Sequence, residues 1–122
     1  MYMNEEIVII MPAYNESASI YNVIKSALKY GDVLVLNDAS TDNTKYISEK
    51  AGAKVISQKK NLGYEGNLSV GFKYVIKNTN YKYMITIDAD GEHKPLSIVS
   101  FINAFEQGAN LVCGKRNFKN RF

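Results

Sequence analysis

Short apolar runs rich in Val and Ile, each followed by polar residues, are the feature that most constrains the fold of this chain. The runs at 7–11, 33–36 and 83–87 are apolar at nearly every position. Such continuous runs are typical of strands buried on both faces of a parallel sheet. Residues 53–57 and 111–114 are two shorter strand candidates. The sequence therefore predicts a sheet with a buried centre.

The segments between these runs predict helices. Apolar side chains recur at helical spacing in three of them: 20–28, 68–76 and 98–105. A further helix is expected to begin near Thr41 or Asp42, after a run of residues favoured at helix N-caps, and to end at about Ala51. Strands that alternate with helices predict an α/β sandwich with a mostly parallel sheet. We expect one domain over residues 1–122.

Composition narrows the class of protein. The chain is 46% hydrophobic and 22% charged, as soluble globular proteins are, and no apolar run approaches the roughly 20 residues that span a bilayer. The N-terminal residues lack the basic region of a secretory signal. The single cysteine, Cys113, forms no internal disulfide, which fits a reducing compartment such as the cytoplasm.

Charge gives little support for a nucleic-acid partner, because the net charge is only +3. Basic residues do gather near the C-terminus, at Lys115, Arg116, Lys119 and Arg121. They form either a solvated tail or a contact with phosphates or an anionic membrane surface. Peripheral contact with the cytoplasmic face of a membrane is thus one of two open alternatives.

The loops that follow the predicted strands are polar and acidic. They are residues 12–16, 37–42 and 88–93. In open α/β sheets ligands bind at the carboxyl ends of the strands, so these loops are expected to meet a ligand. Neither a G-x-G-x-x-G fingerprint nor a P-loop follows the first strand. A phosphate-bearing ligand would therefore need another source of positive charge.

The triplet Asp88-Ala89-Asp90 could supply that charge through a metal ion. Residues i and i+2 of an extended segment point the same way, so both carboxylates are expected on one side. Like charges repel unless a cation lies between them. Oxygen ligands suit a hard cation such as Mg²⁺ or Mn²⁺. The alternative is a solvated acidic turn.

Three other loop residues are candidate ligand contacts. Asp38 ends the second strand and could accept a hydrogen bond from a base or a ribose hydroxyl. Its alternative role is to cap the following helix, but Ser40, Thr41 and Asp42 compete for that position, which favours ligand contact. Tyr14 could lie along a flat base, and Glu16 could accept a bond from a sugar hydroxyl.

Four segments together resemble the motifs of a known family. They are Pro12-Ala13-Tyr14-Asn15-Glu16, residues 37–44 (NDASTDNT), Asn61-Leu62-Gly63-Tyr64 with Gly66, Asn67 and Gly71, and residues 88–95 (DADGEHKP). In this order they resemble the nucleotide-binding half of a family 2 glycosyltransferase with the GT-A fold. The form of the last motif, with Gly114-Lys115-Arg116 after the next strand, is similar to the dolichyl-phosphate mannose synthase-like branch.

The resemblance implies roles for individual residues. The nucleotide-sugar would be bound by the first and second loops and by the triplet: Pro12, Ala13, Tyr14, Glu16, Asp38, Asp88 and Ala89. Asp90 would be the catalytic metal ligand, Asp88 would share the ion or touch the ribose, and Glu92 would be a third oxygen ligand. Arg116 would face the diphosphate or the acceptor phosphate. Two departures put the base preference in question, since Asn37 and Ala39 replace an acid and a glycine of the family motif.

The implied activity is metal-dependent, inverting transfer of a sugar from a GDP- or UDP-sugar to a lipid phosphate or a saccharide. Members of the family continue into an acceptor-binding half, which we expect to be missing here. The alternative is therefore a truncated, non-catalytic module that binds nucleotide sugars. A sugar nucleotidyltransferase would need a glycine- and arginine-rich first loop, and a receiver domain would need an acidic pair after the first strand. Residues 12–16 provide neither.

Overall fold

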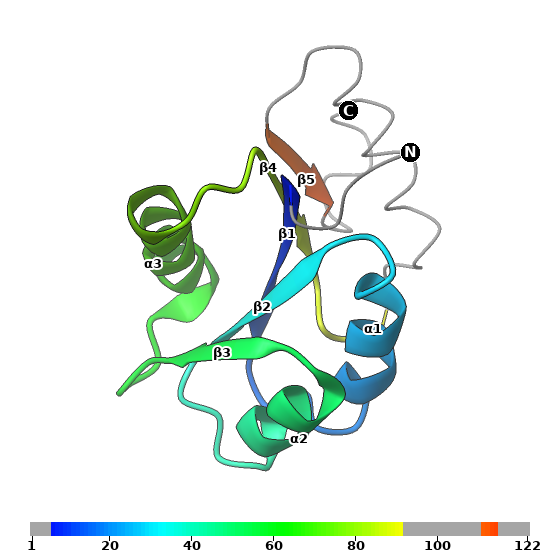
Figure 1. Ribbon diagram of the computed structural model, residues 1–122. Coiled ribbons are helices and arrows are strands. Elements are labelled where there is room, and N and C mark those ends of the chain that lie inside the picture. Colours follow the sequence, from blue (N-terminus) through cyan, green and yellow to red (C-terminus); the bar gives the residue numbers. More distant parts are fainter. Residues whose placement is uncertain (1–5, 92–110, 115–122) are drawn as a thin grey trace.

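The computed structural model describes residues 6–91 and 111–114 of the chain. These residues form a parallel sheet with α3 on one face and α1 and α2 on the other (Figure 1). The strands are β1 (Ile7–Ala13), β2 (Asp32–Asn37), β3 (Lys54–Ser57), β4 (Tyr83–Ile87) and β5 (Leu111–Gly114). The helices are α1 (Ile20–Ala27), α2 (Thr44–Ala51) and α3 (Gly63–Asn78). The predicted α/β sandwich with a parallel sheet is confirmed.

The order of the strands places β1 at the centre of the sheet. The order is β3-β2-β1-β4-β5, and every neighbouring pair is parallel. The chain adds strands outward from β1 through β2 to β3, and then α3 carries it back to β4 on the other side of β1. The strand order therefore reverses at β1, and the crevice at the carboxyl ends of β1 and β4 is where this class of sheet binds ligands.

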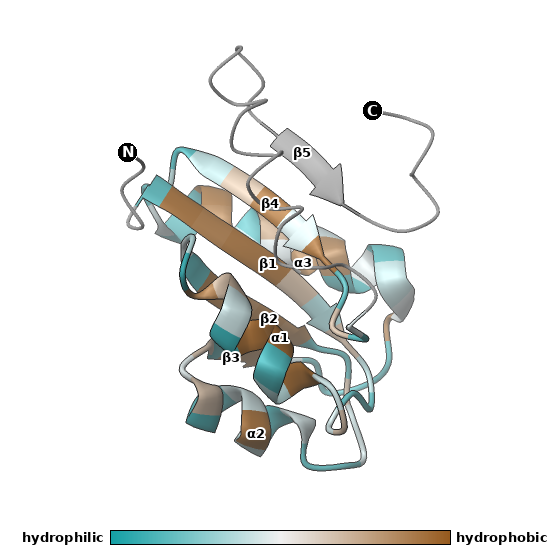
Figure 2. Ribbon diagram, turned by 90° about the vertical axis from the view of Figure 1, so that its right-hand side faces the viewer, coloured by the Kyte–Doolittle hydropathy of each residue, from teal (hydrophilic) through white to brown (hydrophobic). Residues whose placement is uncertain are grey.

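The continuous apolar run of β1 is explained by burial on both faces. Ile7, Ile9 and Met11 pack with α1 and α2, whereas Val8 and Ile10 belong to the core beneath α3. Successive strand residues point to opposite faces, so a strand covered on both sides must be apolar at every position. The brown colour of β1 and β2 in Figure 2 follows from this burial.

β1 is longer than the sequence predicts. The predicted strand covers residues 7–11 and is followed by a loop from Pro12, but β1 continues to Ala13 and pairs with β2 up to Ala13 and Asn37. The ladder with β4 ends earlier, at Ile10 and Thr86. The Ala13 carbonyl accepts a bond from Asp38 on the β2 side, so the nitrogen of Pro12 faces the β4 side, where the ladder has ended. A proline is tolerated there because no ladder hydrogen bond is lost.

The predicted start of α2 is also wrong, by two or three residues. The helix begins at Thr44. The carboxylate of Asp42 accepts hydrogen bonds from the backbone N–H and the hydroxyl of Thr44, and this turn precedes the helix. The predicted stop is confirmed, since Gly52 has a φ of 110° and follows the last residue of α2.

The second helical stripe, at 68–76, lies within α3, which begins earlier, at Gly63. The close approach of α3 to the sheet depends on Gly71. A Cβ atom there would lie 2.3 Å from Cδ1 of Leu36, a fully buried residue of β2. The predicted helix over 98–105 lies outside the described residues, and β5 is found at 111–114 as expected.

Candidate functional site

The polar loops after β1, β2 and β4 meet around one cavity of about 250 Å³. Its lining residues are Pro12, Ala13, Tyr14, Glu16, Asp38, Tyr64, Asn67, Asp88, Ala89 and Asp90. All eight nucleotide-binding or metal-binding candidates of the described residues are therefore brought together. Glu92 and Arg116 lie outside the described residues, and their roles stay predictions.

Hydrogen bonds between the first and second loops hold this edge of the sheet together. The side-chain oxygen of Asn15 accepts a bond of 2.8 Å from the Thr41 backbone, and the Asn15 N–H donates to the Ser40 hydroxyl at 2.9 Å. Asn15 has a φ of 54°, a left-handed conformation that asparagine adopts more readily than most residues. The Glu16 N–H donates to the Thr44 hydroxyl at 2.9 Å. The loop that carries Tyr14 and Glu16 is thus fixed by the loop that carries Asp38.

Asp42 anchors the same junction. One carboxylate oxygen accepts from Thr44 and the other from the Ser17 N–H at 3.2 Å. Desolvation opposes ionisation of Asp42, but the hydrogen bonds from Thr44 and Ser17 outweigh it and lower its pKa to about 2. Asp42 therefore acts as a structural anion at this edge.

Asp38 is a buried side chain, only 4% exposed, at the wall of the cavity. One oxygen accepts a bond of 2.7 Å from the Leu62 N–H and the other a bond of 3.0 Å from the Gly63 N–H. These donors lie at the N-terminus of α3, where the helix dipole favours a negative charge. The sequence offered two alternative roles for Asp38: contact with a ligand, or capping of the following helix, α2. The structure gives Asp38 a third role, as the cap of α3.

The two departures from the family motif flank Asp38. Asn37 donates from its amide to the Ser57 hydroxyl at 3.0 Å and accepts from the Ser40 N–H at 3.2 Å. Its neutral side chain therefore ties the second loop to β3. Ala39 has a φ of 62°, a left-handed conformation in which glycine is unstrained. This explains why a glycine suits the motif at that position.

The acidic triplet leaves β4 and turns at once. Asp88 and Asp90 are half-buried and both line the cavity, while Ala89 between them is buried. The backbone carbonyl of Ala89 accepts a bond of 2.7 Å from the Ser19 hydroxyl. The turn ends in Gly91, whose φ is 84°.

The donor set of this pair fits a hard divalent cation. Both side chains supply carboxylate oxygens, which Mg²⁺ and Mn²⁺ favour. Within residues 6–91 no group of three or more His, Cys, Asp or Glu side chains gathers closely enough to hold a metal by itself. Asp88 and Asp90 would hold an ion that also takes ligands from water or from a bound phosphate, as Mg²⁺ commonly does.

Two residues of α3 were not among the predicted site residues. Tyr64 and Asn67 both line the cavity. Asn67 is 1% exposed; its amide donates to the Leu36 carbonyl at 2.8 Å and its oxygen accepts from Gln58 at 3.1 Å. The signal in the sequence was the asparagine and glycine motif of residues 61–71. It marked the segment but not which of its side chains face the cavity.

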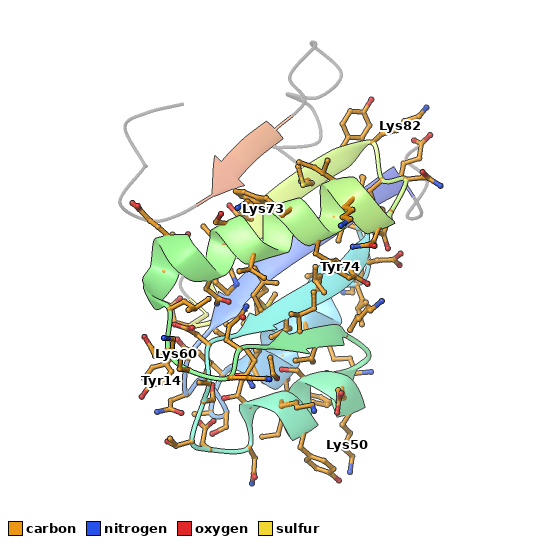
Figure 3. All side chains as sticks on the ribbon, turned by 90° about the vertical axis from the view of Figure 1, so that its left-hand side faces the viewer. Tyr14, Lys50, Lys60, Lys73, Tyr74 and Lys82 are labelled. Carbon is orange, nitrogen blue, oxygen red and sulfur yellow. The ribbon has the colours of Figure 1, made fainter. Side chains whose placement is uncertain are left out.

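A second cavity, of about 280 Å³, lies at the opposite ends of the strands. Val8, Asp32, Lys54, Tyr74 and Tyr81 are among the residues that line it. Its polar groups bond to one another, since Lys54 donates to the Tyr74 hydroxyl at 2.6 Å and the Tyr81 hydroxyl donates to Asp32. In Figure 3, Tyr74, which lines this second cavity, lies well apart from Tyr14, which lines the loop cavity. The two cavities are therefore separate.

Among the described residues, no helix is long and apolar enough to cross a bilayer.

Curated relatives match most of this chain. An uncharacterised protein of Methanocaldococcus jannaschii is 36% identical over 90% of the chain and 52% of its own length. The undecaprenyl-phosphate mannosyltransferase of Micrococcus luteus is 30% identical over 88% of the chain and 46% of its length. The dolichol-phosphate mannosyltransferase of Pyrococcus furiosus is 29% identical over 91% of the chain and 33% of its length. The chain thus spans about a third to a half of these relatives.

Solved structures match the fold. Glucosyl-3-phosphoglycerate synthase from Mycobacterium tuberculosis, in complex with UDP, superposes with a TM-score of 0.71 and 26% identity over 85% of this chain and 41% of its own. The same enzyme with Mn²⁺, UDP-glucose and phosphoglyceric acid gives a TM-score of 0.69 and 25% identity over 85% of this chain and 40% of its own.

The model of one protein family covers nearly the whole chain. It is the model described as glycosyl transferase family 2, and it matches residues 8–121. Together with the parallel sheet, the three convergent loops and the matching relatives, this establishes that the chain belongs to glycosyl transferase family 2 and has the GT-A fold.

Proposed function

We propose that this chain binds a nucleoside-diphosphate sugar through a divalent cation and serves as the donor-binding part of a glycosyltransferase. One observation carries the proposal. Among the described residues that line the loop cavity, the charged ones are all acidic: Glu16, Asp38, Asp88 and Asp90. A diphosphate would be repelled from such a cavity unless a cation lay between the two sets of oxygens.

Mg²⁺ or Mn²⁺ held by Asp88 and Asp90 would supply that charge. Bound there, the ion would act as a Lewis acid on the leaving diphosphate. Asp90 would orient the ion and Asp88 would share it or accept a bond from the ribose. Glu92 would add an oxygen ligand and Arg116 would face a phosphate. Support comes from the similar structure that contains Mn²⁺ and UDP-glucose.

The base and ribose would occupy the part of the cavity formed by the first loop. Pro12 and Ala13 end β1 beneath it, and Tyr14 and Glu16 follow. Tyr14 is 49% exposed and offers a flat apolar face to a base. Glu16 would accept a hydrogen bond from a sugar hydroxyl. The donor would be a GDP- or UDP-sugar, and transfer would invert the anomeric carbon.

The acceptor class we favour is a lipid phosphate. The relatives named undecaprenyl-phosphate and dolichol-phosphate mannosyltransferase support it, with a saccharide as the other acceptor. Such an acceptor phosphate is already ionised near neutral pH, so it needs little help from a general base. With a lipid acceptor the protein would work at the cytoplasmic face of a membrane.

Calorimetric titration of UDP and GDP with and without Mn²⁺ tests the proposal. We expect at least one nucleotide to bind in a Mn²⁺-dependent manner, and Asp90→Ala to remove that dependence. Glu49→Ala, which removes an exposed acid on α2 away from the cavity, is the matched control and should bind as the unmodified chain does. The assignment would be contradicted if Asp90→Ala bound the nucleotide as tightly as the unmodified chain does, both with Mn²⁺ and without it.

Consumption of the sugar donor distinguishes a catalytic glycosyltransferase from a protein that only binds the nucleotide sugar. The glycosyltransferase proposal predicts that the chain, joined to any remaining acceptor-binding part, consumes the sugar donor by transfer or by slow hydrolysis. A protein that binds the nucleotide but leaves every donor intact would instead be the non-catalytic nucleotide-sugar module.

A further inference from the structure

The second cavity, of about 280 Å³, has no part in the proposed function. Asp32 and Lys54, which both line it, are the first residues of β2 and β3. The loop cavity lies at the other ends of the strands, and Tyr74 of the second cavity is well apart from Tyr14 of the loop cavity (Figure 3). A molecule held in the second cavity would therefore not overlap a nucleotide sugar.

The second cavity has an apolar floor and a charged mouth. Val8, Leu34 and Val75 supply apolar lining from β1, β2 and α3 and are at most 3% exposed. Asp32 and Lys54 line the same cavity but are exposed. An amphipathic molecule would bury its apolar part on the floor and keep its charged part at the mouth, which both parts favour.

The two charged groups are opposite in sign and project from the same face of the sheet. Lys54 pairs with Leu34 in the ladder between β3 and β2, and Asp32 lies two residues before Leu34. Strand residues two apart point the same way, and the spacing of strands puts the Cα atoms of Asp32 and Lys54 roughly 8 Å apart. Among the ion pairs of the described residues, these two groups are not paired with each other.

A tyrosine holds each charged group at its own end of the mouth. Nζ of Lys54 donates a bond of 2.6 Å to the Tyr74 hydroxyl and lies 5.1 Å from the centroid of that ring. The Tyr81 hydroxyl donates to the Asp32 carboxylate and is its one donor among the described residues. An ammonium has three N–H donors and a tyrosine has its own O–H. The mouth thus offers further donors at the Lys54 end and a further acceptor at the Asp32 end.

We propose that this cavity binds a small zwitterion with an apolar side chain, of the class of the free apolar amino acids. Its carboxylate would accept bonds from Lys54 and Tyr74, its ammonium would donate to Asp32, and its side chain would lie on the apolar floor. A ligand with a single charge would meet a like charge at one end of the mouth, which disfavours it. The volume is just below the range of roughly 300–1,000 Å³ for drug-sized ligands, which suits a smaller molecule.

Titration of the chain with L-leucine, followed by amide NMR shifts, tests the proposal. Shifts are expected at residues that line the second cavity and not at Asp88 or Asp90. The analogues 4-methylpentanoate and 3-methylbutylamine are leucine without its ammonium and without its carboxylate. Each should bind roughly 10- to 150-fold more weakly, the range for loss of one charge-assisted hydrogen bond. Glycine keeps both charges without the apolar side chain and should also bind more weakly than leucine.

Two variants assign the charges to their residues. Lys54→Met removes the ammonium and should bind leucine no better than it binds 3-methylbutylamine. Asp32→Asn keeps an acceptor for Tyr81 without the charge and should bind leucine no better than it binds 4-methylpentanoate. Lys73→Met, which removes an exposed lysine of α3 that does not line this cavity, is the matched control and should leave leucine binding unchanged.

Equal affinity for leucine and its two singly charged analogues would overturn the proposal. It would also be overturned if Lys54→Met and Asp32→Asn kept the affinity and the preference of the unmodified chain. Absence of binding by leucine, valine, methionine and phenylalanine at millimolar concentration would overturn it as well and would assign the cavity to water. The proposed function is tested separately, because this titration contains neither nucleotide nor Mn²⁺.

Discussion

The hydroxyl of Ser19 donates a hydrogen bond of 2.7 Å to the backbone carbonyl of Ala89. Ser19 occupies the N-cap position of α1 but makes no capping bond to its own helix. Its hydroxyl is used instead to hold the middle residue of the Asp88–Asp90 triplet, 70 residues further along the chain. The start of one helix thereby sets the direction of the acidic pair.

Ser19→Ala should therefore weaken metal binding. Loss of one hydrogen bond is worth about 1 kcal/mol, or roughly fivefold in affinity if it acts wholly on the triplet. Mn²⁺ affinity measured in the presence of nucleotide is the test. Ser69→Ala, on the exposed surface of α3, is the control. A Ser19 variant that lost stability but kept full Mn²⁺ affinity would show that this bond does not position the acids.

Gly71→Ala should destabilise the fold. The added Cβ would lie 2.3 Å from Cδ1 of the fully buried Leu36. Overpacking of this kind costs about 1–3 kcal/mol, against a gain of about 1 kcal/mol in helix propensity. Chemical denaturation should show a lower midpoint.

Gly66→Ala is the matched variant in the same helix. Its nearest neighbour would be Cβ of Leu62 at 3.1 Å, so the propensity gain should largely offset the closer contact. Equal midpoints for the two alanine variants would contradict the steric role of Gly71.

Asp42 should make stability depend on acid pH. The hydrogen bonds from Thr44 and Ser17 lower its pKa in the folded chain to about 2, from the ordinary 3.8 of an aspartate. The ionised form is thus favoured by folding, and the stabilisation is present above about pH 4 and lost as pH falls toward about 2. Asp42→Asn should reduce stability at neutral pH and flatten this acid decline in denaturation experiments. A decline as steep in Asp42→Asn as in the unmodified chain would assign the effect to other carboxylates.

Tyr81 should produce the opposite dependence at alkaline pH. Desolvation, the hydrogen bond to Asp32 and the negative charge of Asp32 raise its pKa to about 12. The protonated form is favoured by folding, so its stabilisation is complete below about pH 10 and lost as pH rises toward about 12. The tyrosinate absorbance of the unmodified chain minus that of Tyr81→Phe should titrate near this raised value. Asp32→Asn should move the titration back toward the ordinary range.

Local sequence was sufficient for the elements of this fold. Strands buried on both faces must be apolar throughout, so residues 7–11 and 33–36 could be identified without knowledge of their neighbours. Helical spacing and Gly52 likewise located α1 and the end of α2. The errors occurred at boundaries. The end of β1 and the start of α2 depend on bonds to residues distant in sequence, such as Ala13 to Asp38 and Ser17 to Asp42.

The candidate site, too, was predicted in part from the sequence. The sequence alone was enough to bring Tyr14, Asp38, Asp88 and Asp90 to one cavity, because loops after parallel strands meet at one edge of the sheet. Tyr64 was missed because helical spacing does not say which side chain of a first turn faces a cavity. The bonds of Asp38 to Leu62 and Gly63 could not be predicted because these partners are more than 20 residues away.

The sequence by itself determined the α/β class and the convergence of three acidic loops, since these follow from local pattern and side-chain type. Only the tertiary structure decided the strand order with β1 at the centre, the contact of Ser19 with Ala89 and the use of Asp38 to hold α3. The physical reason is that a buried hydrogen bond is chosen by whichever donor the packed fold brings within reach, and spacing along the chain does not specify that donor.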